Sequence, residues 1–220
     1  MEIRLAEEVG KMPNLSMDYL AGRENAKELF EQKIAGQMLS SDEAVRKVVL
    51  NCRGIPSAAS SFIDELLFID IFSLNYRHGN SVLLLTDLSD ELYFNVRLSV
   101  EGKKNLIEYA KKNGTYFLTI DQAVHENSSP GLHQTGSPYL LCRHQEITEV
   151  LGFQEGEKQK LLVERIVQRG ERITASMLAE QENITKTAAN NRLNRLYERR
   201  LVFRKLITDN SAEKYEYFFA

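Results

Sequence analysis

The sequence predicts an α/β domain over residues 1–153, followed by a smaller domain over residues 158–220 made of three helices and a β-hairpin. Three observations lead to this division. Two short, continuously apolar runs flank a broad helical pattern in the first part. From Lys158 the apolar spacing is helical, and two strand-like runs then close the chain. Between the parts, residues 153–157 (FQEGE) have the composition of a linker.

The composition is that of an ordinary globular protein, with 43% hydrophobic and 27% charged residues in a chain of 220. No apolar run approaches the roughly 20 residues of a membrane span. The N-terminus, MEIRLAEEVGKMP, has acidic residues where a signal peptide needs a basic start and an apolar core. Cys52 and Cys142 lie far apart without a spacing motif, which favours reduced thiols in a cytoplasmic protein.

The first domain is expected to contain a βαβ unit. Ile3, Leu5 and Val9 suggest a short strand, and helical spacing covers 23–39. The unit itself consists of a strand over 47–52 (KVVLNC), a helix from Ser60 or Ser61 as N-cap through 76, and a strand over 81–86 (SVLLLT). Short links between these elements imply parallel strands joined by a right-handed crossover.

The remainder of this domain has a weaker pattern. A helix is expected from Asp87 through 112, with Gly102 as a possible interruption. A strand over 115–120 should pair with 139–142 as a hairpin, on either side of a Gly/Pro/Ser-rich loop at 126–138. For 146–151 the expectation is a short helix or turn.

The second domain begins with a helix that ends at Gly170, and Thr174 is the expected N-cap of the next helix, over 175–181. The third helix lies in 183–202, NITKTAANNRLNRLYERRLV. Strands over 202–208 and 214–219 follow, separated by turn residues. Three helices and a β-hairpin in this order predict a winged helix-turn-helix.

The third helix has a narrow apolar seam and a face of amides and guanidiniums. Amides can read adenine edges and guanidiniums can bind guanine or phosphate, and both fit a major groove. Such a face on an isolated helix is more often only solvated. Its context favours DNA, because residues 157–220 carry 13 Lys+Arg and 9 Asp+Glu, whereas residues 1–156 carry 15 and 22.

Residues 158–220 resemble the MarR-like winged helix superfamily of bacterial and archaeal regulators. The matching residues are Ile173, Thr174, Leu178, Ala179, 184–190 (ITKTAAN), Leu193, Leu196, Leu201 and Val202. In that family the third helix enters the major groove and the wing touches the DNA backbone. The resemblance implies base-edge or phosphate contacts by Thr185, Lys186, Thr187, Asn190, Asn191 and Arg195, and phosphate contacts by Arg204 and Lys205. One departure is Arg200, where the family usually has Gly before the Leu-Val pair.

Residues 47–86 resemble a STAS-like domain, the fold of anti-sigma-factor antagonists. The resemblance is carried by 48–51 (VVLN), Gly54, Ile55, 59–62 (ASSF), Leu66, Leu67 and 82–84 (VLL). In the phosphoregulated branch an Asp-Ser-Ser-Gly element opens the helix, and the first serine is phosphorylated by a partner kinase. The equivalent residue here is Ser60, although Ala59 and Phe62 replace the Asp and the Gly. The simpler alternative is that Ser60 and Ser61 only cap the helix.

The sequence offers no convincing catalytic residues, metal ligands or cofactor motif. The four histidines, His78, His125, His133 and His144, lack ligand spacing. Cys142 and His144 would share one face of a strand, which keeps thiol–histidine chemistry as a remote alternative. A Gly-rich phosphate loop is absent from the sequence, since Arg53-Gly54 lacks the lysine and the spacing. The protein is therefore not expected to be an enzyme.

The function expected from the sequence is sequence-specific binding of double-stranded DNA by a transcriptional regulator, acting as a homodimer on a pseudo-palindrome. Phosphate would be neutralised by Arg192, Arg195, Arg199, Arg204 and Lys205, while Asn190 and Asn191 read bases. The N-terminal domain would receive a signal from a protein partner, a ligand or a dimer rearrangement. The alternative is a non-catalytic scaffold subunit that uses its winged helix for protein contacts.

Overall fold

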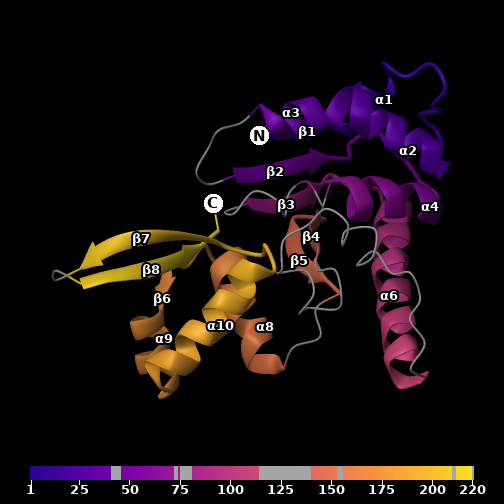
Figure 1. Cartoon of the computed structure of the whole chain (residues 1–220). Coiled ribbons are helices and arrows are strands. Elements are labelled where there is room, and N and C mark those ends of the chain that lie inside the picture. The colour runs from indigo at the N-terminus through magenta and orange to yellow at the C-terminus, as the bar shows by residue number, and fades with distance from the viewer. Residues whose placement is uncertain are drawn as a thin grey trace.

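The computed structural model describes residues 1–40, 46–71, 74, 81–113, 140–152, 156–209 and 212–219, of which 103–113, 209 and 212 are described by their backbone alone. The fold is mixed α/β, as the sequence predicts (Figure 1). Its elements in the first part are β1 (Glu2–Arg4), α1 (Leu5–Val9), α2 (Arg23–Leu29), η1 (Phe30–Ile34), α3 (Ala35–Leu39), β2 (Arg46–Asn51), α4 (Ser60–Ile63), η2 (Asp64–Ile71), β3 (Ser81–Thr86), α6 (Asp90–Asn113), β4 (Leu140–His144) and β5 (Ile147–Leu151). Then follow α8 (Glu157–Val167), β6 (Ile173–Thr174), α9 (Ala175–Glu182), α10 (Lys186–Glu198), β7 (Phe203–Asp209) and β8 (Ala212–Phe218), which we call the C-terminal unit.

The main sheet has five strands in the order β1-β2-β3-β4-β5. The first four are parallel, and β5 returns antiparallel to β4. The pairing of β2 with β3 runs from Arg46↔Ser81 to Asn51↔Thr86, so the predicted parallel βαβ pair is confirmed. Because the parallel strands follow one another in sequence order, right-handed crossovers bring the described helices between them to one face of the sheet.

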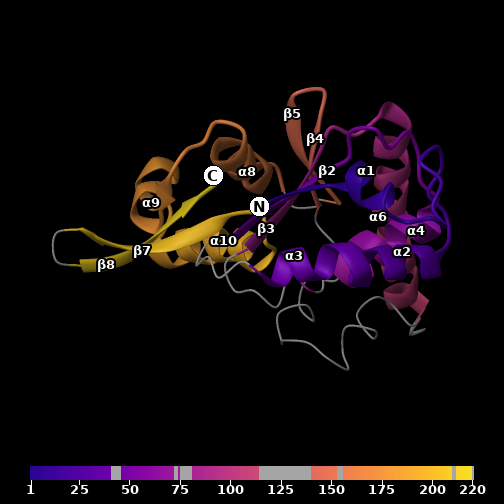
Figure 2. The same cartoon turned by 90° about the horizontal axis from the view of Figure 1, so that it is seen from above.

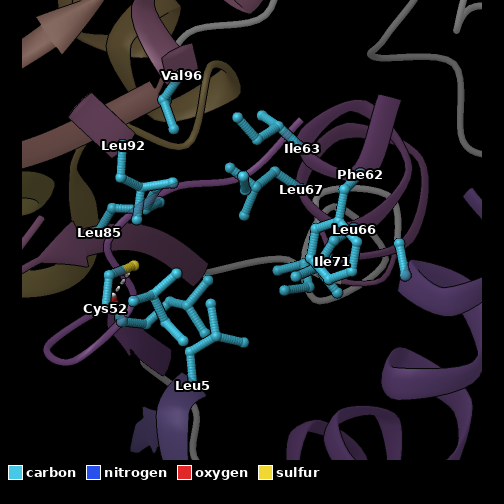
Figure 3. Packing of buried hydrophobic residues seen from close by; sticks show 14 of the residues in the cluster. Leu5, Cys52, Phe62, Ile63, Leu66, Leu67, Ile71, Leu85, Leu92 and Val96 are labelled. Carbon is cyan, nitrogen blue, oxygen red and sulfur yellow. Dashed lines mark hydrogen bonds between the residues drawn. The ribbon is translucent and has the colours of Figure 1, made fainter. Parts of the chain in front are cut away.

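That helix-covered face contains the first hydrophobic core. Side chains at alternate positions of β2 and β3, such as Leu50 and Leu85, point into it. Helices contribute apolar residues from α2, α4, η2 and α6, among them Phe62, Leu67 and Leu92. Figure 3 shows Leu85 and Leu92 on the side of Cys52, and Phe62, Leu66 and Ile71 grouped on the other side of this cluster. The wide apolar stripe predicted for the helix after Ser60 is thus explained by burial against the sheet and the neighbouring helices.

The opposite face of the sheet is covered in part by the C-terminal unit. Val82 and Leu84 of β3 and Leu141 of β4 belong to one buried cluster with Leu162 and Ile166 of α8. Figures 1 and 2 both show the C-terminal unit and α6 on opposite sides of the sheet. A hydrogen bond from Gln168 Nε2 to the Thr148 carbonyl, 2.9 Å long, reinforces the contact. The second core is therefore shared between the sheet and the C-terminal unit.

Several sequence predictions for the first part are wrong in detail. The expected helix or turn over 146–151 is the strand β5, because a two-residue turn at Gln145 and Glu146 makes a hairpin of β4 and β5. The N-cap residue of α4 is Ala59, whose side chain makes no hydrogen bond to the helix. Neither Ser60 nor Ser61 is therefore the N-cap. Only the first part of the expected 3–9 strand is a strand, and α6 runs through Gly102 without interruption.

Other predictions fall on residues that the structure does not describe. These are the strand at 115–120, its pairing with 139–142, the loop at 126–138 and the end of the helix after residue 74. Within the described range, β4 pairs with β3 and β5. His78, His125 and His133 also lie outside the described residues, as do three of the five linker positions, 153–155.

Asp70, in the π-helical segment η2, is expected to make the stability of the protein depend on pH. Burial raises the pKa of its carboxyl to about 7, with the charges of Glu65 and Glu31 adding to the effect and Lys27 opposing it. Its Oδ2 atom is shielded from solvent, and no donor among the described residues contacts it. The folded state therefore holds a proton that the unfolded state releases near pH 4, so this carboxyl makes the protein less stable as the pH rises from about 4 to 7.

We expect Asp70→Asn to stabilise the fold at pH 8 by on the order of 1 kcal/mol and to have little effect at pH 4. Urea unfolding at both pH values measures the difference. The control is Asp18→Asn, since Asp18 is exposed. A stability difference for Asp70→Asn that is the same at pH 4 and pH 8 would contradict the expectation.

Candidate nucleic-acid interface

The turn between α9 and α10 is fixed by capping interactions at both ends. Thr174 Oγ1 accepts a hydrogen bond from the Met177 amide and caps α9, as the sequence predicts. Asn183 ends α9 with a left-handed φ of 52°, and the next amide, that of Ile184, donates to the Ala179 carbonyl. Thr185 then caps α10, with Oγ1 accepting from the Ala188 amide at 3.2 Å. One predicted contact residue, Thr185, therefore also starts the helix.

Helix α10 buries one face and leaves the other to solvent. Ala189, Leu193 and Leu196 are fully buried in the second core. On the opposite side, Thr187, Asn191 and Arg195 are exposed and follow one another at intervals of four, a row about 12 Å long. Exposure extends to Thr185 and Lys186 at the start of the helix, while Asn190 is half-buried.

Within the part of the chain that the structure describes, the exposed polar side chains at the start and along this face of α10 are available to bind a ligand. No side-chain hydrogen bond or ion pair joins Lys186, Asn191 or Arg195 to another described residue. Two positive charges and a free amide on one exposed helical face can bind phosphates and base edges. We call Lys186, Thr187, Asn191 and Arg195 the α10 face.

Arg192 belongs to a different environment, although it lies between members of this face in sequence. Its guanidinium is ion-paired with Glu182 of α9. It also donates from Nε to Gln159 Oε1 at 3.1 Å and from Nη2 to the Lys158 carbonyl at 2.9 Å. These contacts tie α10 to α8 and α9, so we give Arg192 a structural role and remove it from the phosphate contacts.

Arg204 of β7 is likewise held inside the unit. Its guanidinium carbon lies 3.9 Å from the ring centroid of Tyr197 and 4.5 Å from that of Tyr215. One of its terminal nitrogens donates to Asn194 Oδ1 at 3.3 Å, and the same oxygen accepts from the Tyr217 hydroxyl. This cluster fixes the hairpin against α10, and nothing in the local sequence pattern of Asn194 indicates it.

Lys205 is more accessible than Arg204. It is exposed on β7, and its Nζ lies 3.4 Å from Glu216 Oε2, an oxygen that also binds Arg172 at 3.0 Å. Surface pairs of this kind contribute little to stability, so replacing this one by a phosphate contact would cost little. Among the predicted wing contacts, Lys205 is therefore better placed than Arg204.

The backbone after α10 shows how the chain accommodates Arg200 at a position where a glycine is expected. Arg200 has a left-handed φ of 57°. Its amide donates to the Tyr197 carbonyl, and the Leu201 amide donates to the Leu196 carbonyl, which is the Schellman pattern. The turn thus needs the left-handed conformation that glycine adopts freely, and an arginine adopts it here. Arg199, one position earlier, has an ordinary φ of −82° and is half-buried.

We expect Arg200→Gly to raise the free energy of unfolding by about 1 kcal/mol, because it removes the penalty of a left-handed side-chain-bearing residue. The loss of the Arg200 contact with the Tyr197 ring, 5.5 Å away, reduces this gain. Denaturant unfolding gives the measurement, with Arg199→Gly as the neighbouring control, which should destabilise. Destabilisation by Arg200→Gly equal to that of Arg199→Gly would show that the strain is unimportant.

Cys142 and His144 do share a face of β4, but their surroundings do not favour thiol chemistry. Cys142 is fully buried, and burial raises the pKa of its thiol far above the usual range, with smaller contributions from Cys52 and Glu149. The His144 ring stacks on Tyr93 at 4.3 Å, and its Nε2 lies 2.9 Å from Asp90 Oδ1. Within the described residues, no group of three or more His, Cys, Asp or Glu side chains is arranged to hold a metal ion.

In comparisons with known proteins, no family model, no curated protein and no solved structure matches the chain. No helix among the described residues is both long and apolar enough to cross a membrane.

Proposed function

We propose that the chain is a DNA-binding transcriptional regulator in which the C-terminal unit is a winged helix-turn-helix and the α10 face contacts duplex DNA. The observation that carries this proposal is that the α10 face (Lys186, Thr187, Asn191 and Arg195) is exposed on a helix whose other face is fully buried. The element order supports it, since α8, α9 and α10 precede the β7–β8 hairpin and the small sheet has the order β6-β8-β7. Lys205 on β7 would add a phosphate contact.

In this proposal the N-terminal part is a STAS-like domain that receives the signal. It binds a protein partner or a ligand, and Ser60 is a candidate for phosphorylation because it is exposed. The regulator would act as a homodimer. Two α10 helices about 34 Å apart would then enter successive major grooves of a pseudo-palindromic site.

A second candidate is a non-catalytic scaffold that uses the wing for protein contacts. The observation in its favour is an exposed apolar pair on the wing: Leu206 and Tyr215 face each other across β7 and β8 and are 53% and 42% exposed. Exposed apolar pairs suit a protein surface better than a phosphate backbone.

The two candidates differ in their response to generic duplex DNA at low salt. Gel filtration of the full chain with and without a duplex, below about 50 mM salt, should show a complex if the α10 face binds DNA, because phosphate contacts strengthen steeply at low salt. Absence of a shift at every salt concentration would favour the scaffold. Leu206→Ser provides the converse variant, since it should leave DNA binding intact and disrupt only a protein contact.

A further inference from the structure

A cleft of about 960 Å³ lies at the carboxyl ends of the central strands, away from the α10 face. Its walls come mainly from three segments that follow or end strands: 51–56 at the end of β2, 86–89 at the end of β3, and the end of β4 with the turn after it. Glu2, Met17, Asp18 and Val49 complete the lining. The carboxyl ends of parallel strands are the usual position of ligand sites in α/β sheets. Its volume is also that of a small-molecule site.

The cleft occupies the sheet face that the C-terminal unit covers only in part. Residues two apart on a strand share a face, so Thr86 lies on the same side as Val82 and Leu84, and Arg143 on the same side as Leu141. Thr86 and Arg143 line the cleft, whereas the other three belong to the second core. Strands β3 and β4 therefore carry both the cleft and the C-terminal unit.

Three residues with a left-handed, strained backbone conformation line this cleft. Asp87, Gln145 and Glu146 line it and have φ values of 55°, 48° and 68°. The other described non-glycine residues with positive φ, Asn183 and Arg200, end helices. A two-residue hairpin with two left-handed residues prefers Asn-Gly, yet here both positions carry long polar side chains. Strain of this kind is found preferentially at ligand sites.

Two guanidiniums, Arg53 and Arg143, line the cleft together with the carboxylates of Glu2, Asp18, Asp87 and Glu146. Arg53 is paired with Asp87 at 3.1 Å, and the carboxylate of Glu2 accepts from Asn51 Nδ2 at 2.9 Å. Arg143 donates from Nε to Thr148 Oγ1 at 3.1 Å, and no carboxylate of the described residues lies within 4.0 Å of its guanidinium. The pKa of Lys47 is lowered by burial and further by the positive charge of Arg143.

We propose that this cleft binds a small organic acid or phosphate monoester, with its anionic group on Arg143 and its apolar part against Val49. An arginine fork recognises the two oxygens of a carboxylate or phosphate with bidentate geometry. The rim carboxylates of Asp18 and Glu146 accept hydrogen bonds from hydroxyl or amino groups and disfavour polyphosphates. This assignment does not depend on whether the C-terminal unit binds DNA.

The test uses the full chain and four ring compounds of similar shape: benzoate, phenyl phosphate, neutral benzamide and cationic benzamidine. Saturation-transfer NMR and titration calorimetry should show saturable binding of benzoate, phenyl phosphate or both, and weaker or no binding of the neutral and cationic compounds. Preference between the two anions distinguishes a carboxylate ligand from a phosphate ligand.

Arg143→Gln should weaken binding of the preferred anion at least tenfold, and Arg143→Lys should weaken it less, because it keeps the charge and loses the fork. Arg97→Gln, on an exposed position of α6, is the matched control and should bind like the natural chain. The proposal is overturned by preferential binding of benzamidine, by the absence of saturable binding of either anion, or by equal affinities of Arg143→Gln and Arg97→Gln.

Discussion

Replacing Lys186, Asn191 and Arg195 together by alanine is expected to weaken binding of duplex DNA by about a hundredfold or more at 100 mM salt. Two cations and one amide leave the α10 face, and each contact to a phosphate or base edge is worth on the order of 1 kcal/mol or more. The fold should be unaffected, because none of the three side chains bonds to another described residue. Fluorescence anisotropy with a labelled duplex measures the affinity, and circular dichroism checks the fold.

The matched control removes two positive charges elsewhere. Arg4 and Arg97 have side chains 64% and 53% exposed and form surface ion pairs. Their double alanine variant should bind DNA within about twofold of the natural chain, because exposed charges remote from the contact are screened by salt. Equal weakening by both variants would mean that net charge, and not the α10 face, determines the affinity.

Leu84→Ala is expected to destabilise the protein by about 2–5 kcal/mol. Leu84 is 1% exposed and lies in the core that the sheet shares with the C-terminal unit. Its truncation leaves a cavity between β3 and α8, so we expect both parts to unfold together in one transition at a lower denaturant concentration. Urea unfolding followed by far-ultraviolet circular dichroism and by tyrosine fluorescence tests this expectation.

Leu98→Ala provides the comparison, since Leu98 is a leucine of α6 that is 46% exposed. Its truncation should change the free energy of unfolding by less than about 0.5 kcal/mol. Two separate transitions, of which Leu84→Ala shifts only one, would show that the sheet and the C-terminal unit do not share a cooperative core.

The sequence predicts the centre of the sheet well because local signals there agree. The run 81–86 (SVLLLT) is apolar at its four central positions, which is typical of a strand buried on both faces, and all six residues of β3 are buried. What covers each face depends on distant residues. One face packs against helices of the βαβ unit, as expected, whereas the packing of α8 on the other face depends on residues some 80 positions away.

The sequence does not predict the hairpin of β4 and β5, because its turn lacks the residues that usually mark one. Gln145 and Glu146 adopt the left-handed conformation without the Asn-Gly signal that marks such turns. The turn at Arg200, after α10, is a different case. The resemblance to winged helices places a glycine there, and the structure shows that the arginine adopts the left-handed conformation of a glycine.

In the candidate interface, the sequence identifies the polar residues of α10 but does not show which of them are exposed and which bond to neighbouring helices. Arg192 and Arg195 are three positions apart and chemically identical, yet one is bound by Glu182, Gln159 and Lys158 and the other is exposed. The difference depends on which side of the helix faces α8 and α9. Arg204 is similar, since its partners Tyr197 and Tyr215 come from different elements.

The most direct test of the proposed function is the salt dependence of DNA affinity for the natural chain and for Arg195→Ala, measured from 50 to 200 mM salt. A phosphate contact contributes about 0.9 to the slope of log affinity against log salt. If Arg195 contacts phosphate, the slope of the variant should be smaller by about that amount and its affinity lower at every salt concentration. Equal slopes and equal affinities would contradict the assignment of the α10 face to DNA.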